Sequence, residues 1–580
     1  MSSEKNKEAI RHNEGVIKNN DQLQLGGELM VLQTQTLWGD IFTESKNKLF
    51  IERNILPLFL QKCRWFGGKA RVVSKIRIED VYPLNVEDTT YFLTLIVVEY
   101  VQRLSELYFL PMVFMPSRQL MDESAYDSQS LICRAEIRNE PGFIIDSSYD
   151  KVFRDYLLIS MKRRERIKFA TAVLEFNSGA ISNIDLSHGV NSHILKADQS
   201  NTAIIYNDQY FFKFYRKLER EVNPDLEMVR FLSEKAGFAN SPGYVGNIKL
   251  QDDEDRVIVF GLLQKKVDNR GNAWDLSTDS VGHFFKRVIA GAGANQQNVP
   301  ELVDKPFITF EEAPKPIQDF VGRDFYKQVV QLGYRTAEMH LALAADQSDP
   351  AFAPENFTPH YQRELFASLG NLLRDRFNLL EGSLHKLASK NREFAKKVLS
   401  LEPDVLECLR EICDTPIAAV KTRIHGDFHL GQVLFTGEDF VIIDYEGEPG
   451  FTFSERRLKK DPLKDVAGMM RSFHYAAFEK ILLDENYRSG EMQNLEIWAE
   501  QWQHYISRFY LGAYMNRMGK EWSEEDNILI RTFLIEKAIY ELGYELNGRP
   551  DWVIIPLRGI EYHMSRYYKE RKARKPADKS

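Results

Sequence analysis

Cysteine is scarce in this chain of 580 residues, which has four, Cys63, Cys133, Cys408 and Cys413, with no CxxC spacing. This scarcity argues against a disulfide framework and against a cysteine-based zinc site, and it favours a reduced, cytoplasmic protein. The sequence also lacks any run of about 18 apolar residues, and its polar N-terminus has no apolar core. We therefore expect neither a membrane span nor a signal peptide.

An excess of basic charge is missing too, since 76 Lys and Arg face 84 Asp and Glu, a formal net charge of −8. The acidic balance argues against a general nucleic-acid binder. Hydrophobic residues at 43% and charged residues at 28% are typical of a soluble globular protein. The length predicts two or three domains. Aromatic residues are abundant at 12%, and their positions decide whether they fill cores or line a sugar-binding cleft.

Changes in composition divide the chain into five segments. The polar residues 1–28 predict a disordered leader, and residues 29–168, with short β-rich runs, predict a small α/β or mostly β domain. We expect a β-rich segment with one helix at 169–267 and a mainly helical region at 268–567. Residues 568–580 predict a frayed basic tail.

The β-rich segment contains a clear hairpin pattern. TAIIY (202–206) and QYFFKFY (209–215) are separated by Asn207-Asp208, which predicts two strands joined by a two-residue turn. A helix is predicted next, from about Pro224 to Gly237.

The stretch IHGDFHLGQVLFTGEDFVIIDYEGEP, residues 424–449, carries the chemistry. Asp427 is followed five residues later by Gln432, and an apolar strand ends at Asp444. Phosphoryl transfer from a nucleotide needs a carboxylate to orient the attacking hydroxyl and oxygen ligands for Mg²⁺. The protein-kinase catalytic loop has this spacing. We therefore predict Asp427 as the base, and Gln432 and Asp444 as metal ligands.

A kinase also needs a strand lysine at the nucleotide phosphates and a helix glutamate that orients it. Lys213 lies in the predicted hairpin, and Glu227 in the following helix is the expected partner, with Glu221 as the second candidate. A loop of backbone N–H groups would hold the phosphates. The candidates, on the strand just before Lys213, are Ser200, Asn201 and Thr202.

Two other classes compete with a kinase. The pattern His425-x-Asp427-x-His429 has metal-ligand spacing, because alternate residues of a strand point the same way. Such a metal-dependent hydrolase would bind Zn²⁺, Mn²⁺ or Fe rather than Mg²⁺. A pseudokinase that only binds a partner is the third class, and the presence of Lys213, Asp427 and Asp444 argues against it.

A family resemblance joins these motifs. HGDFHLGQVL, VIIDYEGEP, SERRLKKDPLKDVAGMMRSFHYAAFEK and LIEKAIYELGYELNGRPDWVIIPLRGI resemble bacterial maltokinases in the same order, as do QKCRWFGGKAR and GLLQKKVDNRGNAW. The resemblance covers nearly everything after the leader. It implies an α+β, bilobed protein-kinase-like fold with a small β-rich N-lobe, a large mainly helical C-lobe and an N-terminal α/β cap domain. It also implies an enzyme that uses ATP and Mg²⁺ to phosphorylate maltose at its anomeric hydroxyl, and whose product, maltose 1-phosphate, feeds α-glucan (glycogen-like) synthesis.

The resemblance assigns further roles by position. Lys213 and Glu227 would position the ATP phosphates, and Asp465 would brace the catalytic-loop backbone. The adenine would lie against the segment Gln264, Lys265, Lys266 and Val267. Gln432 replaces the Asn of protein kinases, and DYEG replaces DFG. Trehalose synthase is a possible partner, and a glucosamine kinase of the same fold is the nearest alternative.

The sugar site is predicted from chemistry rather than from a motif. Carboxylates and amides bind sugar hydroxyls, whereas aromatic rings cover the apolar faces of a sugar. The segment EKAIYELGYELNGRPDW, residues 536–552, offers both groups on a predicted helix and just beyond it. The candidates are Tyr540, Glu541, Tyr544, Arg549 and Trp552, with His429 as a further contact beside the base.

Overall fold

The computed structural model describes residues 29–101, 104–119, 129–179, 184–195, 200–292, 299–483 and 492–574. The chain forms two compact units. The first comprises residues 1–226 and 243–266, and the second comprises residues 227–242 and 267–580. The predicted leader, residues 1–28, lies outside the described residues.

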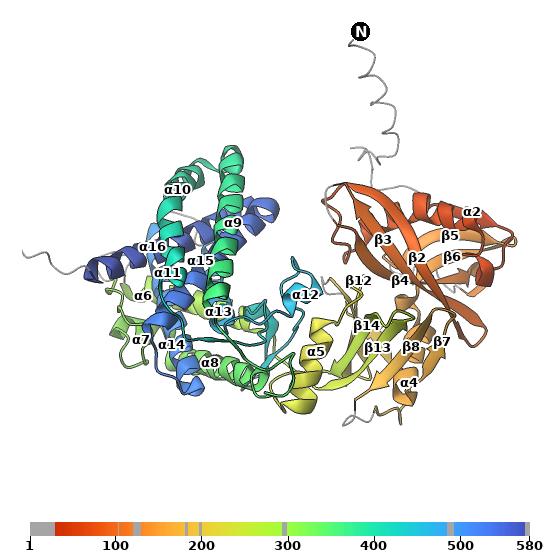
Figure 1. The fold of residues 1–580 in the computed structure, drawn as a ribbon, viewed down its shortest axis with the longest axis horizontal. Coiled ribbons are helices and arrows are strands. Elements are labelled where there is room, and N and C mark those ends of the chain that lie inside the picture. Colours follow the sequence, from red (N-terminus) through yellow and green to blue (C-terminus); the bar gives the residue numbers. More distant parts are fainter. Residues whose placement is uncertain are drawn as a thin grey trace, which may run out of the picture. The chain divides into compact units, whose positions relative to one another are not determined.

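The first unit contains a cap sheet with the strand order β1-β5-β6-β4-β3-β2. Figure 1 labels strands β2 to β6 of this sheet. β1 runs parallel to β5, and the other neighbours are antiparallel. Helix α3 contributes Leu56, Phe59 and Leu60 to its core, and Phe50 of the preceding helix α2 packs against that core. The bounds are β1 Val31–Thr34, α2 Ser45–Phe50, α3 Leu56–Lys62, β2 Val73–Val86, β3 Thr89–Tyr100, β4 Glu106–Pro116, β5 Leu131–Ile137 and β6 Glu140–Asp146.

The segment QKCRWFGGKAR closes this core rather than forming a phosphate loop. Cys63 and Phe66 are buried in the cap core. A Cβ atom at Gly68 would lie 2.5 Å from the ring of Phe66 and from the hydroxyl of Tyr100, so only glycine fits in this turn. The glycine at position 68 is therefore explained by packing.

The first unit also contains the N-lobe sheet, with the order β7-β8-β13-β14-β11-β10-β9. Helix α4 packs on β8 and β13. β7, which precedes the predicted domain boundary at 168/169, belongs to this sheet, and the boundary itself stays a prediction. The bounds are α4 Lys151–Arg163, β7 Arg166–Lys168, β8 Ala172–Ser178, β9 Ser192–Ile194, β10 Thr202–Tyr206, β11 Tyr210–Phe214, β12 Lys217–Leu218, α5 Pro224–Arg230, β13 Tyr244–Asp252 and β14 Val257–Lys265.

The predicted hairpin is confirmed, but three residues, 207–209, rather than two separate the paired Tyr206 and Tyr210. β10 and β11 pair antiparallel, and Asn207 and Asp208 in the turn have φ angles of 51° and 56°. Asn and Asp tolerate this left-handed conformation better than other non-glycine residues, and it matches the twist of the strands. The turn therefore sets the register that places Lys213 on β11, opposite Ala203.

Arg216 joins the cap to the N-lobe. Its guanidinium is fully buried and binds Asp146 (NH2 to Oδ2, 2.6 Å) and the hydroxyl of Ser148 (2.8 Å), both at the end of β6. Its Nε also donates to Thr202 Oγ1 on β10 (2.8 Å). β12 follows directly and pairs with β4 of the cap sheet. The two sheets therefore share a buried ion pair as well as a backbone ladder.

We expect Arg216→Met to destabilise the first unit by about 3–5 kcal/mol, because it leaves the buried carboxylate of Asp146 without its cation. Urea unfolding of the purified protein measures this change. The control is Arg166→Met, which removes an exposed pair with Glu175 (side chain of Arg166 66% exposed) and should cost less than about 1 kcal/mol. Equal losses would contradict a structural role for Arg216.

The second unit is mainly helical. α8 packs along α14, and α13 lies against α14, α15 and α6. α9, α11, α15 and α16 surround a second apolar core that includes Leu373, Ile535 and Leu557. The bounds are α6 Ala273–Ala292, α7 Lys315–Val321, α8 Arg323–Leu343, α9 Pro359–Ser383, α10 Ser389–Leu399, α11 Glu402–Asp414, α12 Phe453–Arg456, α13 Leu463–Leu483, α14 Met492–Met518, α15 Glu524–Gly548 and α16 Ile554–Arg574.

The C-terminal prediction needs a correction. α16 continues to Arg574, so residues 568–574 are helical and not a frayed tail. Buried Tyr567 and the ion pair between Arg571 and Glu407 (2.8 Å) explain why the helix persists. Within the described residues, no helix is long and apolar enough to cross a membrane.

Two short β-ladders complete the second unit. β15 (Glu355–Asn356) pairs with β16 (Val420–Lys421) just before the segment 424–449. β17 (Val433–Phe435) and β18 (Phe440–Ile442) form an antiparallel hairpin inside that segment. These ladders fix both ends of the predicted catalytic loop.

Candidate active site

The predicted catalytic loop is held by one buried carboxylate, Asp465, at the start of α13. The backbone N–H groups of His425 and Gly426 donate to its two oxygens at 2.7 and 3.0 Å. Nε2 of the buried His340 lies 3.1 Å from Asp465 Oδ2. Burial alone would raise the pKa of Asp465, yet these hydrogen bonds hold it below its ordinary value. The contacts are those expected of a residue that braces the loop.

The histidines of the loop bind its backbone. His425 is buried, its Nε2 lies 2.9 Å from the carbonyl oxygen of Ile443, and its Nδ1 accepts from the N–H of Asp427 (3.4 Å). Nδ1 of His429 accepts from the N–H of Gly431 (3.1 Å). Burial lowers the pKa of His429. Both nitrogens of His425 are thus engaged with backbone groups, which argues against the His425/Asp427/His429 metal site of a hydrolase.

The hairpin β17–β18 brings the two predicted metal ligands together. The N–H of Ile443 donates to the carbonyl oxygen of Gln432 (2.9 Å), and Gln432 Nε2 donates to Asp444 Oδ2 (2.8 Å). Asp444 has a φ of +68°, a conformation that Asp and Asn adopt more readily than other non-glycine residues. The long side chain of Gln432 therefore reaches the carboxylate that the strand delivers.

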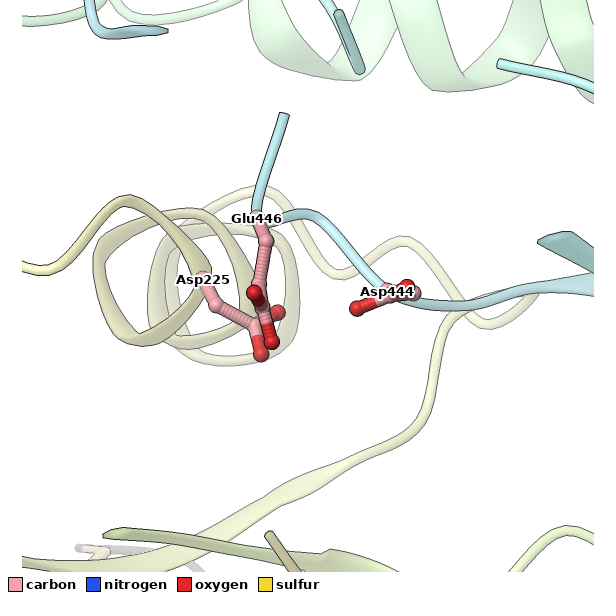
Figure 2. A group of neighbouring side chains, drawn as sticks. All are labelled: Asp225, Asp444 and Glu446. Carbon is pink, nitrogen blue, oxygen red and sulfur yellow. The ribbon is translucent and has the colours of Figure 1, made fainter. Parts of the chain in front are cut away.

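The structure adds Glu446, which the sequence analysis did not single out. Carboxylate oxygens of Asp444 and Glu446 lie within 4.8 Å of each other, and Figure 2 shows both side chains on the segment that follows β18. The signal in the sequence was an acidic residue two positions after Asp444. Clustered carboxylate and amide oxygens suit a hard divalent cation such as Mg²⁺.

The partner expected for Lys213 needs a correction. In the first unit Lys213 Nζ binds Asp225 Oδ2 (2.9 Å), and the hydroxyl of Tyr215 donates to the same oxygen (2.8 Å). Asp225 is the second residue of α5 (Figure 2). Glu227, in the second unit, instead accepts from Arg423 (2.5 Å) and Arg457 (2.7 Å). The carboxylate paired with the strand lysine thus lies two residues earlier than predicted.

Of the three residues predicted to bind the nucleotide phosphates, one lies in a strand and two lie in the loop before it. Thr202 is buried in β10, where its hydroxyl binds Arg216, so its side chain belongs to the contact between cap and N-lobe. Ser200 and Asn201 lie just before the strand, and Asn201 Oδ1 accepts from the N–H of Arg216 (3.4 Å). Residues 196–199, the preceding part of the loop, are outside the described residues. Ser200 and Asn201 stay predictions.

The predicted adenine-binding segment, residues 264–267, lies where the chain passes for the last time from the first unit to the second. Gln264 is buried at the end of β14, and Lys265 closes the strand. Lys266 binds the exposed turn residue Asp208 (2.7 Å). The first unit ends at Lys266 and the second resumes at Val267. Contact of these four residues with adenine stays a prediction.

Lys537 on helix α15, a residue that the sequence analysis missed, connects the predicted sugar-binding face of that helix with Asp427, the predicted base. Lys537 Nζ lies 3.1 Å from Glu448 Oε1 and 3.5 Å from Asp427 Oδ1. Burial alone would lower the pKa of Lys537, but the two carboxylates raise it above its ordinary value. Tyr540, one turn further, lies beside the ammonium, with its ring centroid 5.1 Å from Nζ. The spacing Lys537, Tyr540, Glu541, Tyr544 on one helix face was the available signal.

Ion pairs order the rest of this face. Glu541 accepts from Arg471 Nε (3.0 Å) and NH2 (2.6 Å). The buried Glu545 binds Arg549 (2.8 Å), whose guanidinium carbon lies 4.1 Å from the ring centroid of Trp552. Tyr544 is 64% exposed. The structure thus brings the predicted residues of α15 together, and their contact with a sugar stays a prediction, as it does for His429.

Comparison with known proteins agrees with this architecture. A protein-family model described as "Maltokinase N-terminal cap domain" matches residues 59–150. Residues 59–150 are thus similar to a maltokinase cap domain. A solved structure described as glucosamine kinase in complex with glucosamine, ADP and inorganic phosphate aligns with a TM-score of 0.55 and 16% identity, covering 91% of this chain and 99% of that one. The predicted kinase-like fold with an N-terminal cap is confirmed.

Curated relatives extend the similarity. A glucosamine kinase of Streptacidiphilus jiangxiensis is 23% identical over 406 residues, which are 69% of this chain and 78% of that protein. A glucosamine kinase of Mycolicibacterium smegmatis is 22% identical over 365 residues, 62% of this chain and 77% of that protein. Together with the cap domain, these similarities support a kinase that acts on a sugar.

Proposed function

We propose that the protein is a maltokinase, which transfers the γ-phosphoryl group of ATP to the anomeric hydroxyl of maltose in the presence of Mg²⁺. The observation that carries the proposal is the contact of Lys537 with Asp427 (3.5 Å), which joins the base of a kinase-type loop to a helix face of aromatic and acidic side chains. The cap-domain match supports maltose as the acceptor. Following the family resemblance, maltose 1-phosphate would enter α-glucan synthesis, and trehalose synthase is a candidate partner.

Asp427 performs the proton chemistry of the proposed reaction. Its carboxylate accepts the proton of the anomeric hydroxyl while that oxygen forms a bond to the γ-phosphorus and the bond from the γ-phosphorus to ADP breaks. The ammonium of Lys537, 3.5 Å from Asp427 Oδ1, is close enough to stabilise the negative charge that develops on the attacking oxygen. Lys537 is thus a second residue assigned to the acceptor side.

The nucleotide side is assigned to other residues. Asp444, Gln432 and Glu446 would hold Mg²⁺ through oxygen atoms, since Mg²⁺ prefers carboxylate and carbonyl ligands. When bound, the cation would neutralise charge between the phosphates. Lys213, held by Asp225 at 2.9 Å, would donate to phosphate oxygens.

The charge of the α15 face favours a neutral sugar. Glu448 binds Lys537, Glu541 binds Arg471, and Glu545 binds Arg549. An amino sugar carries an ammonium group, which prefers a carboxylate that is not already neutralised. These three carboxylates each have a cation, so their remaining acceptor capacity suits hydroxyl groups. This observation favours maltose over glucosamine.

A panel of maltose, glucose and glucosamine with Mg-ATP tests the proposal. With maltose we expect release of ADP and formation of a sugar phosphate. We expect kcat/KM for glucosamine to be lower than that for maltose by about tenfold or more, which corresponds to about 1.4 kcal/mol of transition-state stabilisation. Phosphorylation of glucosamine alone would make the protein a glucosamine kinase, the name its relatives carry. If none of the sugars were phosphorylated, the proposal would be wrong.

A further inference from the structure

A polar cavity lies among the C-terminal helices of the second unit, in addition to the site described above. Its volume is about 80 Å³, and residues of α14, α15 and α16 line it together with Pro306 and Met470. A single water molecule needs about 10–15 Å³ of such space, so the cavity accommodates several water molecules or one small ion. The polar groups that matter are Arg508 on α14, Arg531 on α15, and His563, Arg566 and Glu570 on α16.

Arg508 is a buried cation with neutral partners. The residue is 6% exposed, and it donates to the carbonyl oxygens of Lys305 (Nε, 2.8 Å) and His504 (NH1, 3.2 Å). Burial lowers the pKa of Arg508, whereas Tyr562, its other hydrogen-bond partner, raises it. Among the residues that the structure describes, none forms a carboxylate salt bridge with Arg508. A buried guanidinium without a counter-ion is costly, which is a reason for an anion to enter.

His563 faces the same cavity. It is 8% exposed and makes no hydrogen bond with any residue of the described ranges. Burial and the surrounding guanidinium groups of Arg471, Arg566, Arg508 and Arg531 hold its pKa well below the ordinary value, so the ring is neutral at pH 7. A neutral imidazole keeps one N–H donor and one acceptor nitrogen. Because His563 lines the cavity, its ring nitrogens can pair with a ligand or with ordered water there.

The carboxylates around the cavity form ion pairs with arginines other than Arg508. Glu570 binds Arg531 at 2.6 Å, and Asp304 binds Arg566 at 2.5 Å. Glu411 also binds Arg531. These pairs leave the charge of Arg508 uncompensated, next to the donor of His563.

We propose that this cavity is a binding site for a small tetrahedral oxyanion, with Arg508 and His563 as its ligands. Guanidinium groups match the geometry of phosphate-type oxygens, and the imidazole N–H supplies a further donor. The site is independent of the proposed kinase reaction, because it uses none of the residues assigned to that reaction.

The test uses inorganic phosphate and tungstate with the full-length protein. Crystals soaked in tungstate are expected to show an anomalous peak between Arg508 and His563, and calorimetric titration with phosphate is expected to show one binding site that Asp444→Asn retains. The variants Arg508→Met and His563→Leu should each weaken phosphate binding by at least about tenfold.

Two controls make the result decisive. Arg571→Met, on the same helix but outside the cavity lining, should bind phosphate as the unaltered protein does. His563→Leu keeps a similar volume and removes no hydrogen bond to the described residues, so it should fold even if Arg508→Met does not. A cavity that contains only water, or phosphate binding unchanged in His563→Leu, would overturn the proposal.

Discussion

Replacing Asp427 with Asn is expected to lower kcat for sugar phosphorylation by about two to four orders of magnitude, the usual effect of losing a general base. The amide has the shape of the carboxylate but does not accept the proton of the attacking hydroxyl. The loop should keep its conformation, because Asp465 and His425 hold its backbone. The KM for ATP should change little. Initial rates of ADP release with saturating maltose measure the effect.

The matched control for this variant is Asp279→Asn, an exposed aspartate on α6. It should have the rate of the unaltered protein. If Asp427→Asn retained full turnover, Asp427 would not be the base and the proposed mechanism would be wrong.

Asp444→Asn is expected to reduce kcat/KM by at least about two orders of magnitude, because removing one metal-ligand charge loses several kcal/mol of transition-state stabilisation. Asn tolerates the φ of +68° at this position, so the backbone should not change. The Mg²⁺ concentration for half-maximal rate should rise as well. A titration of rate against Mg²⁺ separates this loss from a folding defect.

Glu438→Gln is the control, since Glu438 is exposed in the turn of the same β17–β18 hairpin. It should leave both kcat/KM and the Mg²⁺ requirement unchanged. An unchanged Mg²⁺ requirement in Asp444→Asn would assign the metal to other ligands.

Sequence patterns within short segments predicted many of the secondary-structure elements of this protein. The strands flanking Asn207-Asp208, the loop that contains Asp427 and the helix that contains Tyr540 all depend on interactions between residues close in sequence. The family resemblance supplied the cap domain, which the match to residues 59–150 confirms. Gln432 donates to Asp444 (2.8 Å), as their closeness in the predicted loop implies, and their assignment to a single metal site stays a prediction.

Long-range contacts explain the errors. Asp225 and Glu227 lie two positions apart on α5, so their side chains point about 200° apart around the helix and only one can meet Lys213. Glu227 is bound by Arg423 and Arg457, about 200 residues further along the chain, which no local pattern indicates. Lys537 was missed for the same reason, because its carboxylate partners lie about 100 residues away in sequence.

The bracing of the catalytic loop by Asp465 has a consequence for how substrate selectivity can vary. The hydrogen bonds from His425 and Gly426 to Asp465 restrict the loop when the protein folds. The loss of conformational entropy that ordering this loop requires therefore occurs during folding and not during sugar binding. Binding free energy from the sugar is then available for aligning the reacting atoms. Under the proposed function, substitutions on the α15 face can therefore change which sugar is accepted while Asp427, the proposed base, keeps its geometry.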